Sequence, residues 1–219
     1  LVTSIADGSA TITATSGSAS ATATTTVSQT ASSVTLSPMS LSFTSVGDIA
    51  THTPTVKDAG GAVISGATVT WATSSSSVAT VSSAGLVTAV ANGTATITAT
   101  SGSASATATT TVSQTASSVT LSPTSLSFTS VGDTATHTPT VKDAGGAVIS
   151  GATVTWATSD TEVATVSSAG LVKAVANGTA TITATSGSAS ATATATVSQV
   201  ISSVTLSPTS LSFTSVGDT

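Results

Sequence analysis

The chain has 219 residues, of which only 5% are charged, and its three basic and eight acidic side chains give a net charge of −5. So few cations exclude a nucleic-acid groove, because phosphate binding needs clustered lysine and arginine. They exclude a basic membrane-surface helix for the same reason. The chain has no cysteine, which excludes a disulfide framework, a thiolate metal site and a cysteine nucleophile.

The sequence repeats itself with a period of 85 residues, as the phrase SSVTLSP shows at Ser32, Ser117 and Ser202. A unit of this length can bury a small core of its own, which favours separate domains. The period divides the chain into the end of one repeat, two whole repeats and the start of a fourth, at 1–31, 32–116, 117–201 and 202–219.

The two whole repeats differ at nine of 85 positions. The segments that join successive repeats are short and contain no long Gly/Pro hinge, which predicts semi-rigid connections between neighbouring domains. These linkers are expected at Gln29–Ser33, Gln114–Ser118 and Gln199–Ser203.

Within residues 32–116 the pattern is β throughout, beginning with a strand after Pro38 in which Leu41 and Phe43 share a face. The next strand carries His52 and Pro54, and we expect it at a sheet edge because proline cannot donate to the ladder. Ala67–Ser74 follows, with Val69 and Trp71 on one face.

Thr94–Thr100 reads TATITAT, a clean alternation that places Ala95, Ile97 and Ala99 on one face. Turn-forming residues separate the predicted strands. They lie at Val46–Asp48, Asp58–Gly61, Ser83–Gly85, Asn92–Gly93 and Ser101–Ser103. Seven or eight short strands at roughly ten-residue spacing predict a β-sandwich, and no window shows helical periodicity.

The chain has two tryptophans and three phenylalanines, so one large ring is available to anchor each small core. We expect a structural core from equivalent side chains of the two whole repeats. Its members are Trp71, Trp156, Val69, Val154, Leu86, Leu171, Ile97, Ile182, Phe43 and Phe128.

Four segments together resemble the bacterial immunoglobulin-like domain, group 2. In one repeat they are Val46-Gly47-Asp48, Thr70–Ser74, Val78–Val87 and Gly93–Ala99, and in the next Val131-Gly132-Asp133, Thr155–Ser159, Val163–Val172 and Gly178–Ala184. The resemblance implies an all-β chain of tandem immunoglobulin-like β-sandwich domains of about 85 residues each. It also implies an extracellular, non-enzymatic role, since such domains occur in intimin- and invasin-like stalks, cell-wall and S-layer proteins.

No catalytic residue is expected. The two histidines, His52 and His137, occupy equivalent positions in different repeats, so they cannot pair within one domain, and half-buried packing is the preferred interpretation. Asp160 and Glu162 stand where the sister repeat has serines, which favours a solvated loop. No cofactor is expected, with weak Ca²⁺ binding at these acids or at turn aspartates such as Asp48 as the alternative.

Two further features allow a functional and a structural interpretation. Asn92-Gly93-Thr94 and Asn177-Gly178-Thr179 match the N-glycosylation sequon. The first partial repeat has Asp7-Gly8 there, which favours a turn.

The threonines that alternate along Thr94–Thr100, with Thr107, Thr109 and Thr111 beside them, would form an outward face. Such a face could bind polysaccharide, carry glycans or pack against copies of itself, or it is simply a solvated strand surface.

The sequence thus predicts a non-enzymatic stalk or spacer segment of an adhesin-like protein on the bacterial cell surface or outside the cell. A segment of a self-assembling extracellular fibre is the alternative, and a carbohydrate- or host-protein-binding module ranks third. The expected partners are neighbouring repeats of the same chain and, in the fibre hypothesis, further copies. Neither nucleic acid nor membrane insertion is expected for this segment.

Overall fold

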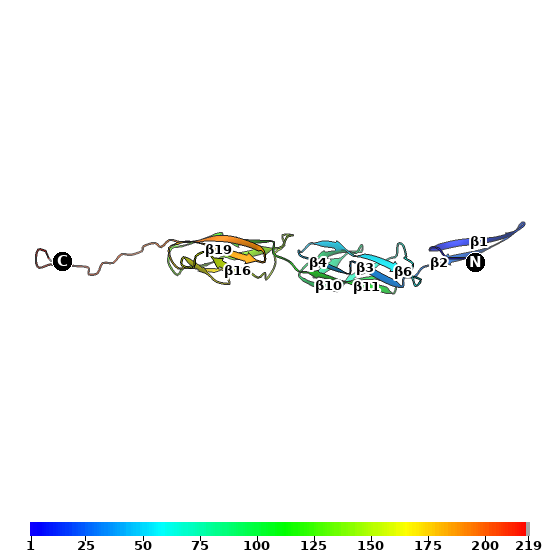
Figure 1. Ribbon diagram of the computed structural model, residues 1–219, viewed down its shortest axis with the longest axis horizontal. Helices are drawn as coiled ribbons and strands as arrows, with labels where there is room; N and C mark the ends of the chain where they lie inside the picture. Colours follow the sequence, from blue (N-terminus) through cyan, green and yellow to red (C-terminus); the bar gives the residue numbers. More distant parts are fainter. Residues whose placement is uncertain (218–219) are drawn as a thin grey trace. The chain divides into compact units, whose positions relative to one another are not determined.

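The computed structural model describes residues 1–217, and its secondary structure in that range consists of β-strands with no helix (Figure 1). The predicted all-β fold is therefore confirmed. By its internal contacts the chain divides into two compact units. Unit 1 comprises Leu1–Thr115 with Asp143–Ala147, and unit 2 comprises Ala116–Lys142 with Val148–Thr219, of which Asp218 and Thr219 lie outside the described range.

Each complete repeat contributes nine strands. In residues 32–116 they are β3 (Ser33–Ser37), β4 (Ser40–Phe43), β5 (Ile49–Thr51), β6 (Thr53–Lys57), β7 (Thr70–Thr73), β8 (Ala79–Val81), β9 (Leu86–Ala89), β10 (Gly93–Ser101) and β11 (Ala104–Val112). In residues 117–201 they are β12 (Ser118–Ser122), β13 (Ser125–Phe128), β14 (Thr134–Thr136), β15 (Thr138–Lys142), β16 (Thr155–Thr158), β17 (Ala164–Val166), β18 (Leu171–Ala174), β19 (Gly178–Ser186) and β20 (Ala189–Val197).

Three sheets build the sandwich in each repeat. In unit 1 the largest has the order β4-β11-β10-β7, and the smaller ones are β5-β9-β8 and β3-β6. The partners of β10 and β5 are antiparallel, whereas β4 runs parallel to β11. In unit 2 the same arrangement recurs as β13-β20-β19-β16, β14-β18-β17 and β12-β15. Pro54 lies in β6, which pairs with β3 in a two-stranded sheet. The single strand expected to carry both His52 and Pro54 is not formed, because His52 lies between β5 and β6.

The long hairpin of each repeat closes on a two-residue loop. β10 and β11 pair from Gly93↔Val112 to Ser101↔Ala104, so Gly102 and Ser103 form the turn. Gly102 has φ +58°, a conformation that glycine adopts without the steric cost a β-carbon would bring. This turn fixes the hairpin register, and the register places Ala95, Ile97 and Ala99 on the buried face.

Trp71 joins the two parts of the core in unit 1. One buried cluster, which includes Phe43 and Ile97, lies towards β8 and β9, and a second, which includes Val34 and Leu36, lies towards β3 and β6. The half-buried Trp71 packs against both clusters. Trp156 does the same between the two clusters of unit 2. The single large ring of each repeat therefore spans a core otherwise built of small aliphatic side chains.

The turn before β9 accommodates this ring because it ends in glycine. Gly85 has φ +78°, and a β-carbon there would lie 2.5 Å from the His52 carbonyl oxygen and 2.7 Å from Cζ2 of Trp71. Gly170 meets His137 and Trp156 at the same distances in unit 2. Neither the backbone carbonyl nor the packed indole can move freely, so the Ser83–Gly85 turn is fixed by the tryptophan as well as by its own backbone.

Most of the expected core side chains lie inward. Ile97, Ile182, Phe43 and Phe128 are buried, whereas the two tryptophans and the valines at 69 and 154 are half-buried. The expectation was wrong for Leu86 and Leu171, which are 36% and 43% exposed. Adjacent residues of a strand point to opposite faces, and Val87, fully buried, takes the inward position on β9.

The segments at either end carry fewer elements. Residues 1–31 contain one hairpin of β1 (Gly8–Ser16) and β2 (Ala19–Val27), which pair throughout. Residues 202–217 contain no strand, and their apolar side chains, Val204, Leu206, Leu211 and Phe213, are exposed.

We predict that Gly85→Ala destabilises unit 1 by about 3 kcal/mol, since it adds an overpacking clash to the strain of a positive φ. Gly66→Ala is the matched control, because Gly66 has φ +71° but open space around its β-carbon position, and it should cost about 1 kcal/mol. Both would be measured by denaturant unfolding of Trp156→Phe chains, in which Trp71 is the remaining tryptophan. Equal losses for the two variants would contradict the packing described for Trp71.

Candidate functional site

The burial and hydrogen bonds of the two histidines indicate a structural role. His52 and His137 are fully buried, not half-buried as expected. Nδ1 of His52 lies 2.8 Å from the Pro38 carbonyl oxygen, and that of His137 lies 2.7 Å from the Pro123 carbonyl oxygen. Because a carbonyl only accepts, Nδ1 carries the proton and donates. Each ring thereby binds the junction of two strands to the carbonyl group of the preceding proline. Its Nε2 has no hydrogen-bond partner among residues 1–217.

The acidic pair of the second repeat closes its own loop. The backbone amide of Glu162 donates to Asp160 Oδ1 at 2.8 Å, and both residues are exposed. Asp48 likewise accepts the amide of Ser45 across its own turn at 3.1 Å. Within the described range, no group of three or more histidine, aspartate and glutamate side chains lies close enough together to hold a metal ion.

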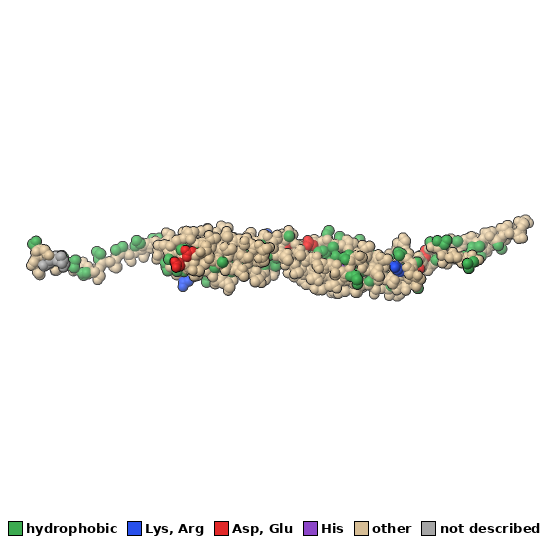
Figure 2. Space-filling model, viewed as in Figure 1, with side chains coloured by type: hydrophobic (Ala, Val, Ile, Leu, Met, Phe, Trp, Pro, Cys, Tyr) green, Lys and Arg blue, Asp and Glu red, His purple; other side chains and the backbone are tan. Residues whose placement is uncertain are grey.

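The alternating threonines form a continuous outer face on the largest sheet of each unit. The register sets Thr94, Thr96, Thr98 and Thr100 directly opposite Thr111, Thr109, Thr107 and Ser105. Thr94 and Thr96 are exposed, whereas Thr98 and Thr100 are half-buried. No charged residue is found at these eight positions, and charged side chains are sparse on the face of the molecule shown in Figure 2. The predicted hydroxyl face therefore exists, but its surroundings give no indication of a ligand.

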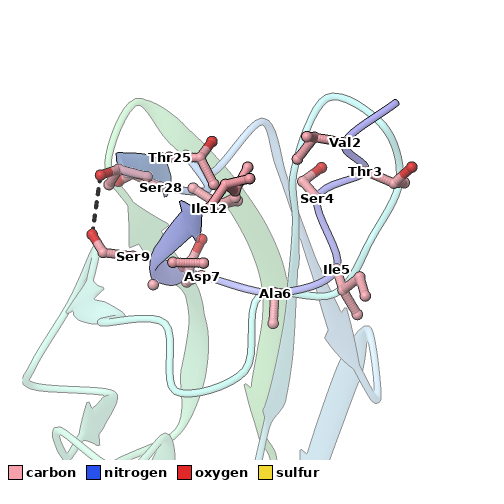
Figure 3. Close-up of a pocket in the computed structure, with 14 residues that line it drawn as sticks. Val2, Thr3, Ser4, Ile5, Ala6, Asp7, Ser9, Ile12, Thr25 and Ser28 are labelled. Atoms are coloured by element: carbon pink, nitrogen blue, oxygen red, sulfur yellow. Dashed lines mark hydrogen bonds between the residues drawn. The ribbon is translucent and has the colours of Figure 1, made fainter. Parts of the chain in front are cut away.

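A hollow lies on the β1–β2 hairpin of unit 1. It measures about 770 Å³ and is lined by residues 2–10, 12 and 25–28, among them Ile5, Ile12 and Thr25 (Figure 3). Ile12 corresponds to Ile97 one repeat later, yet it is 40% exposed where Ile97 is fully buried. The hollow is thus the uncovered side of a hairpin face whose equivalent in residues 32–116 is covered.

A cluster of three polar side chains lies where one repeat ends and the next begins. The backbone amide of Gln29 donates to Asp7 Oδ1 at 2.6 Å, and its side-chain amide donates to Asp58 Oδ2 at 2.8 Å. The other oxygen of Asp58 accepts the amide of Ala62 at 2.9 Å, within its own loop. The glutamine therefore connects the turn before β1 with the loop after β6.

The same contacts recur one period later, and all three residues again belong to unit 1. Gln114 donates its backbone amide to Asn92 Oδ1 at 2.7 Å and its side-chain amide to Asp143 Oδ2 at 2.7 Å. At the third position the amide of Gln199 donates to Asn177 Oδ1 at 2.8 Å. We call Asp7–Gln29–Asp58 and Asn92–Gln114–Asp143 the linker clusters.

The hydrogen bonds of the linker clusters stabilise the ionised aspartates. The Gln29 amide, and after it the amide of Ala62, hold the pKa of Asp58 below its ordinary value. The Gln114 amide has the same effect on the pKa of Asp143. A carboxylate that accepts such bonds is favoured over its protonated form, so both aspartates stay charged acceptors across the neutral range.

The linker clusters were not predicted from sequence. The Asn92-Gly93 pair was assigned to a tight turn, but it forms a bend at the start of β10, and the asparagine side chain instead binds the linker amide. One observation could have indicated this: Asp replaces Asn at position 7, and both offer the side-chain oxygen that the glutamine amide needs.

Residues 33–112 and 115–197 match the model of the bacterial Ig-like domain (group 2). The match covers well over half of the chain, so the chain belongs to this family. The comparison with curated proteins found no match. Within residues 1–217 there is no helix long and apolar enough to cross a membrane.

The chain is also similar to solved structures of bacterial surface proteins. Invasin, described as a bacterial integrin-binding protein, is 20% identical with a TM-score of 0.45, and the match covers 89% of this chain and 46% of invasin. Domains 1–6 of the surface layer protein SbsC are 24% identical with a TM-score of 0.38, covering 84% of this chain and 31% of that structure. The Escherichia coli adhesin FdeC is 19% identical with a TM-score of 0.38, covering 82% and 68%.

We predict that Gln29→Ala raises the pKa of Asp58 towards its ordinary value, because the largest cause of its depression is removed. A carboxyl whose folded-state pKa is depressed stabilises the fold above its unfolded-state pKa, and this contribution is lost as the pH falls through the folded-state pKa. In the variant that contribution should be smaller. Carboxyl-carbon NMR titration measures the change, with Gln199→Ala as control. An unchanged Asp58 titration in Gln29→Ala would contradict the contact.

Proposed function

We propose that this chain is a non-enzymatic stalk or spacer segment of a protein on the bacterial cell surface or secreted from the cell. The observation that carries the proposal is that a complete tryptophan-centred core occurs twice in tandem, in repeats that differ at nine of 85 positions. Near-identical repeats that each have their own core lengthen the protein without introducing a new binding or catalytic site. Membership of the bacterial Ig-like family supports this role.

The distribution of side chains argues against an enzyme. Each histidine is fully buried, so it offers no base to a substrate. The turn acids Asp48 and Asp133 accept backbone amides of their own turns. A function shared by the repeats also cannot depend on Asp160 and Glu162, because the sister repeat carries serines there.

A carbohydrate- or protein-binding module is less well supported. Recognition of such partners commonly uses exposed aromatic side chains. Here Phe43 and Phe128 are buried, and both tryptophans pack into the cores. Among the described aromatics, only Phe213 is strongly exposed, at 58%, in a segment without strands.

The experiment that tests the spacer role varies the number of repeats. Chains carrying zero, one or two further copies of residues 117–201 after Ile201 would be compared by small-angle X-ray scattering and by sedimentation over a wide concentration range. We expect the maximum dimension to increase by a constant ~30–40 Å per copy, from strands of about eight residues and their loops, with every chain monomeric.

An 85-residue Gly/Ser insertion is the matched control, because the dimension of a flexible coil grows with the square root of its length. A maximum dimension that does not grow with added repeats would contradict the spacer role. Fibres or sheets that form with rising concentration would contradict it in favour of assembly, for which the uncharged hydroxyl face is the natural contact surface.

A further inference from the structure

Two structural requirements meet just before the long hairpin of the first complete repeat. Residue 92 has to offer a side-chain oxygen, because the backbone amide of Gln114 donates to Asn92 Oδ1 at 2.7 Å. Residue 93 has to be glycine, because Gly93 has φ +143° and a β-carbon there would lie 2.9 Å from Cγ2 of Val78. Asparagine and aspartate meet the first requirement equally, so the fold accepts Asn-Gly or Asp-Gly at this place.

The second complete repeat has the same arrangement. Asn177 Oδ1 accepts the backbone amide of Gln199 at 2.8 Å. Gly178 has φ +147°, and a β-carbon there would lie 2.7 Å from Cγ2 of Val163. Each of these contacts lies within one repeat, so both requirements belong to the repeat itself.

The aspartate form is present in the same chain. Residues 1–31 have Asp7-Gly8 at the equivalent place. Asp7 Oδ1 accepts the backbone amide of Gln29 at 2.6 Å, and Gly8 has φ +139°. A carboxylate in place of the amide therefore keeps both the hydrogen bond and the backbone conformation.

We propose that Asn92 and Asn177 are sites of spontaneous deamidation, and that the fold retains the aspartate product in the manner of Asp7. The two residues are the only asparagines of the chain, and each precedes a glycine. Both asparagines are exposed, so water and hydroxide reach them. A glycine has no side chain to shield its backbone nitrogen from the neighbouring side chain.

The reaction needs only the chain and water. The backbone nitrogen of Gly93 loses its proton to hydroxide and attacks Cγ of Asn92, the bond from Cγ to Nδ2 breaks, and ammonia leaves with a proton taken from water. The resulting cyclic imide is then hydrolysed. Cleavage of the new bond between Cγ and the Gly93 nitrogen gives aspartate, whereas cleavage of the original peptide bond gives isoaspartate, in which the main chain is longer by one carbon. Overall, water is consumed and ammonia is released.

The hydrogen bond at Asn92 suits this chemistry. Oδ1 gains negative charge as Cγ is attacked, and a donor already placed at that oxygen stabilises the charge. The Gln114 amide is such a donor. Gly93 pairs with Val112 at the open end of the hairpin, where local opening costs least and frees the attacking nitrogen.

Conversion to aspartate changes the charge of the repeat and keeps its shape. Each conversion replaces a neutral amide by a carboxylate, so the net charge falls by one unit at each of the two sites, from −5 to −7. The bond from the Gln114 amide then becomes charge-assisted and therefore stronger. This inference does not depend on the proposed stalk role, because it concerns a reaction of the chain with water.

The test follows the intact mass of the full chain during incubation in mildly alkaline buffer. We expect an increase of about 1 Da per conversion, because an NH₂ group is replaced by OH, and peptide mapping should locate the increases at Asn92 and Asn177. Asn92→Asp should retain only the increase at Asn177, and the double variant with Asn177→Asp should show none. The same chain unfolded in guanidinium chloride gives the reference rate. A folded chain of constant mass, while the unfolded chain converts, would overturn the proposal.

Hydrogen exchange of the Gln114 backbone amide tests whether the fold retains the product. The amide should exchange as slowly in Asn92→Asp as in the parent chain, because a carboxylate oxygen replaces the amide oxygen as acceptor. In Asn92→Ala, the matched control, the acceptor is removed and exchange should be about tenfold faster. Exchange in Asn92→Asp as fast as in Asn92→Ala would overturn the claim that the aspartate product is accommodated.

Discussion

The packing of one indole ring against one glycine turn is the contact on which each repeat depends. Trp71 reaches two buried clusters that otherwise consist mainly of valine, leucine, isoleucine and alanine, and Gly85 leaves the space that the ring fills. A single tryptophan buries on the order of 200 Å² of surface, a large share for so small a core. The same contact recurs at Trp156 and Gly170, so each repeat carries its own anchor and does not need its neighbour's.

Much of this fold could be predicted from sequence, because its determinants are local. The alternation in Thr94–Thr100 fixes which side chains face inward, and the Ser101–Ser103 turn fixes the register of the long hairpin. The prediction of core side chains failed where two apolar residues are adjacent in a strand. Side-chain hydrogen bonds were missed where the two residues are distant in the sequence. Leu86 beside Val87 offered two candidates for one inward position, and only packing decides between them. The hydrogen bond from Gln114 to Asp143 joins residues 29 positions apart in the sequence, so no local sequence pattern predicts it.

Each complete repeat carries its own core, so the repeats are interchangeable as folding units. The sites that differ between the two repeats include positions 75–77, of which Ser75 is half-buried and the other two are exposed. Asp160 and Glu162 replace serines there. The buried Thr110, whose hydroxyl has no hydrogen-bond partner among the described residues, is alanine at position 195. Neither of these changes touches the tryptophan or the glycine turn. Two further differences lie in the linker, where Val200 and Ile201 replace Thr115 and Ala116. Variation therefore extends to the linker but leaves the tryptophan and its glycine turn unchanged.

Mechanical unfolding of the single chain tests most directly whether each tryptophan-centred core is an independent unit. Pulled from its two ends, the chain should unfold in two separate events, each releasing roughly 250 Å of contour length, as expected for about 85 residues at ~3.3–3.6 Å each less the folded length. A single event of about twice that length would contradict the account, because it would mean that the two repeats share one cooperative core.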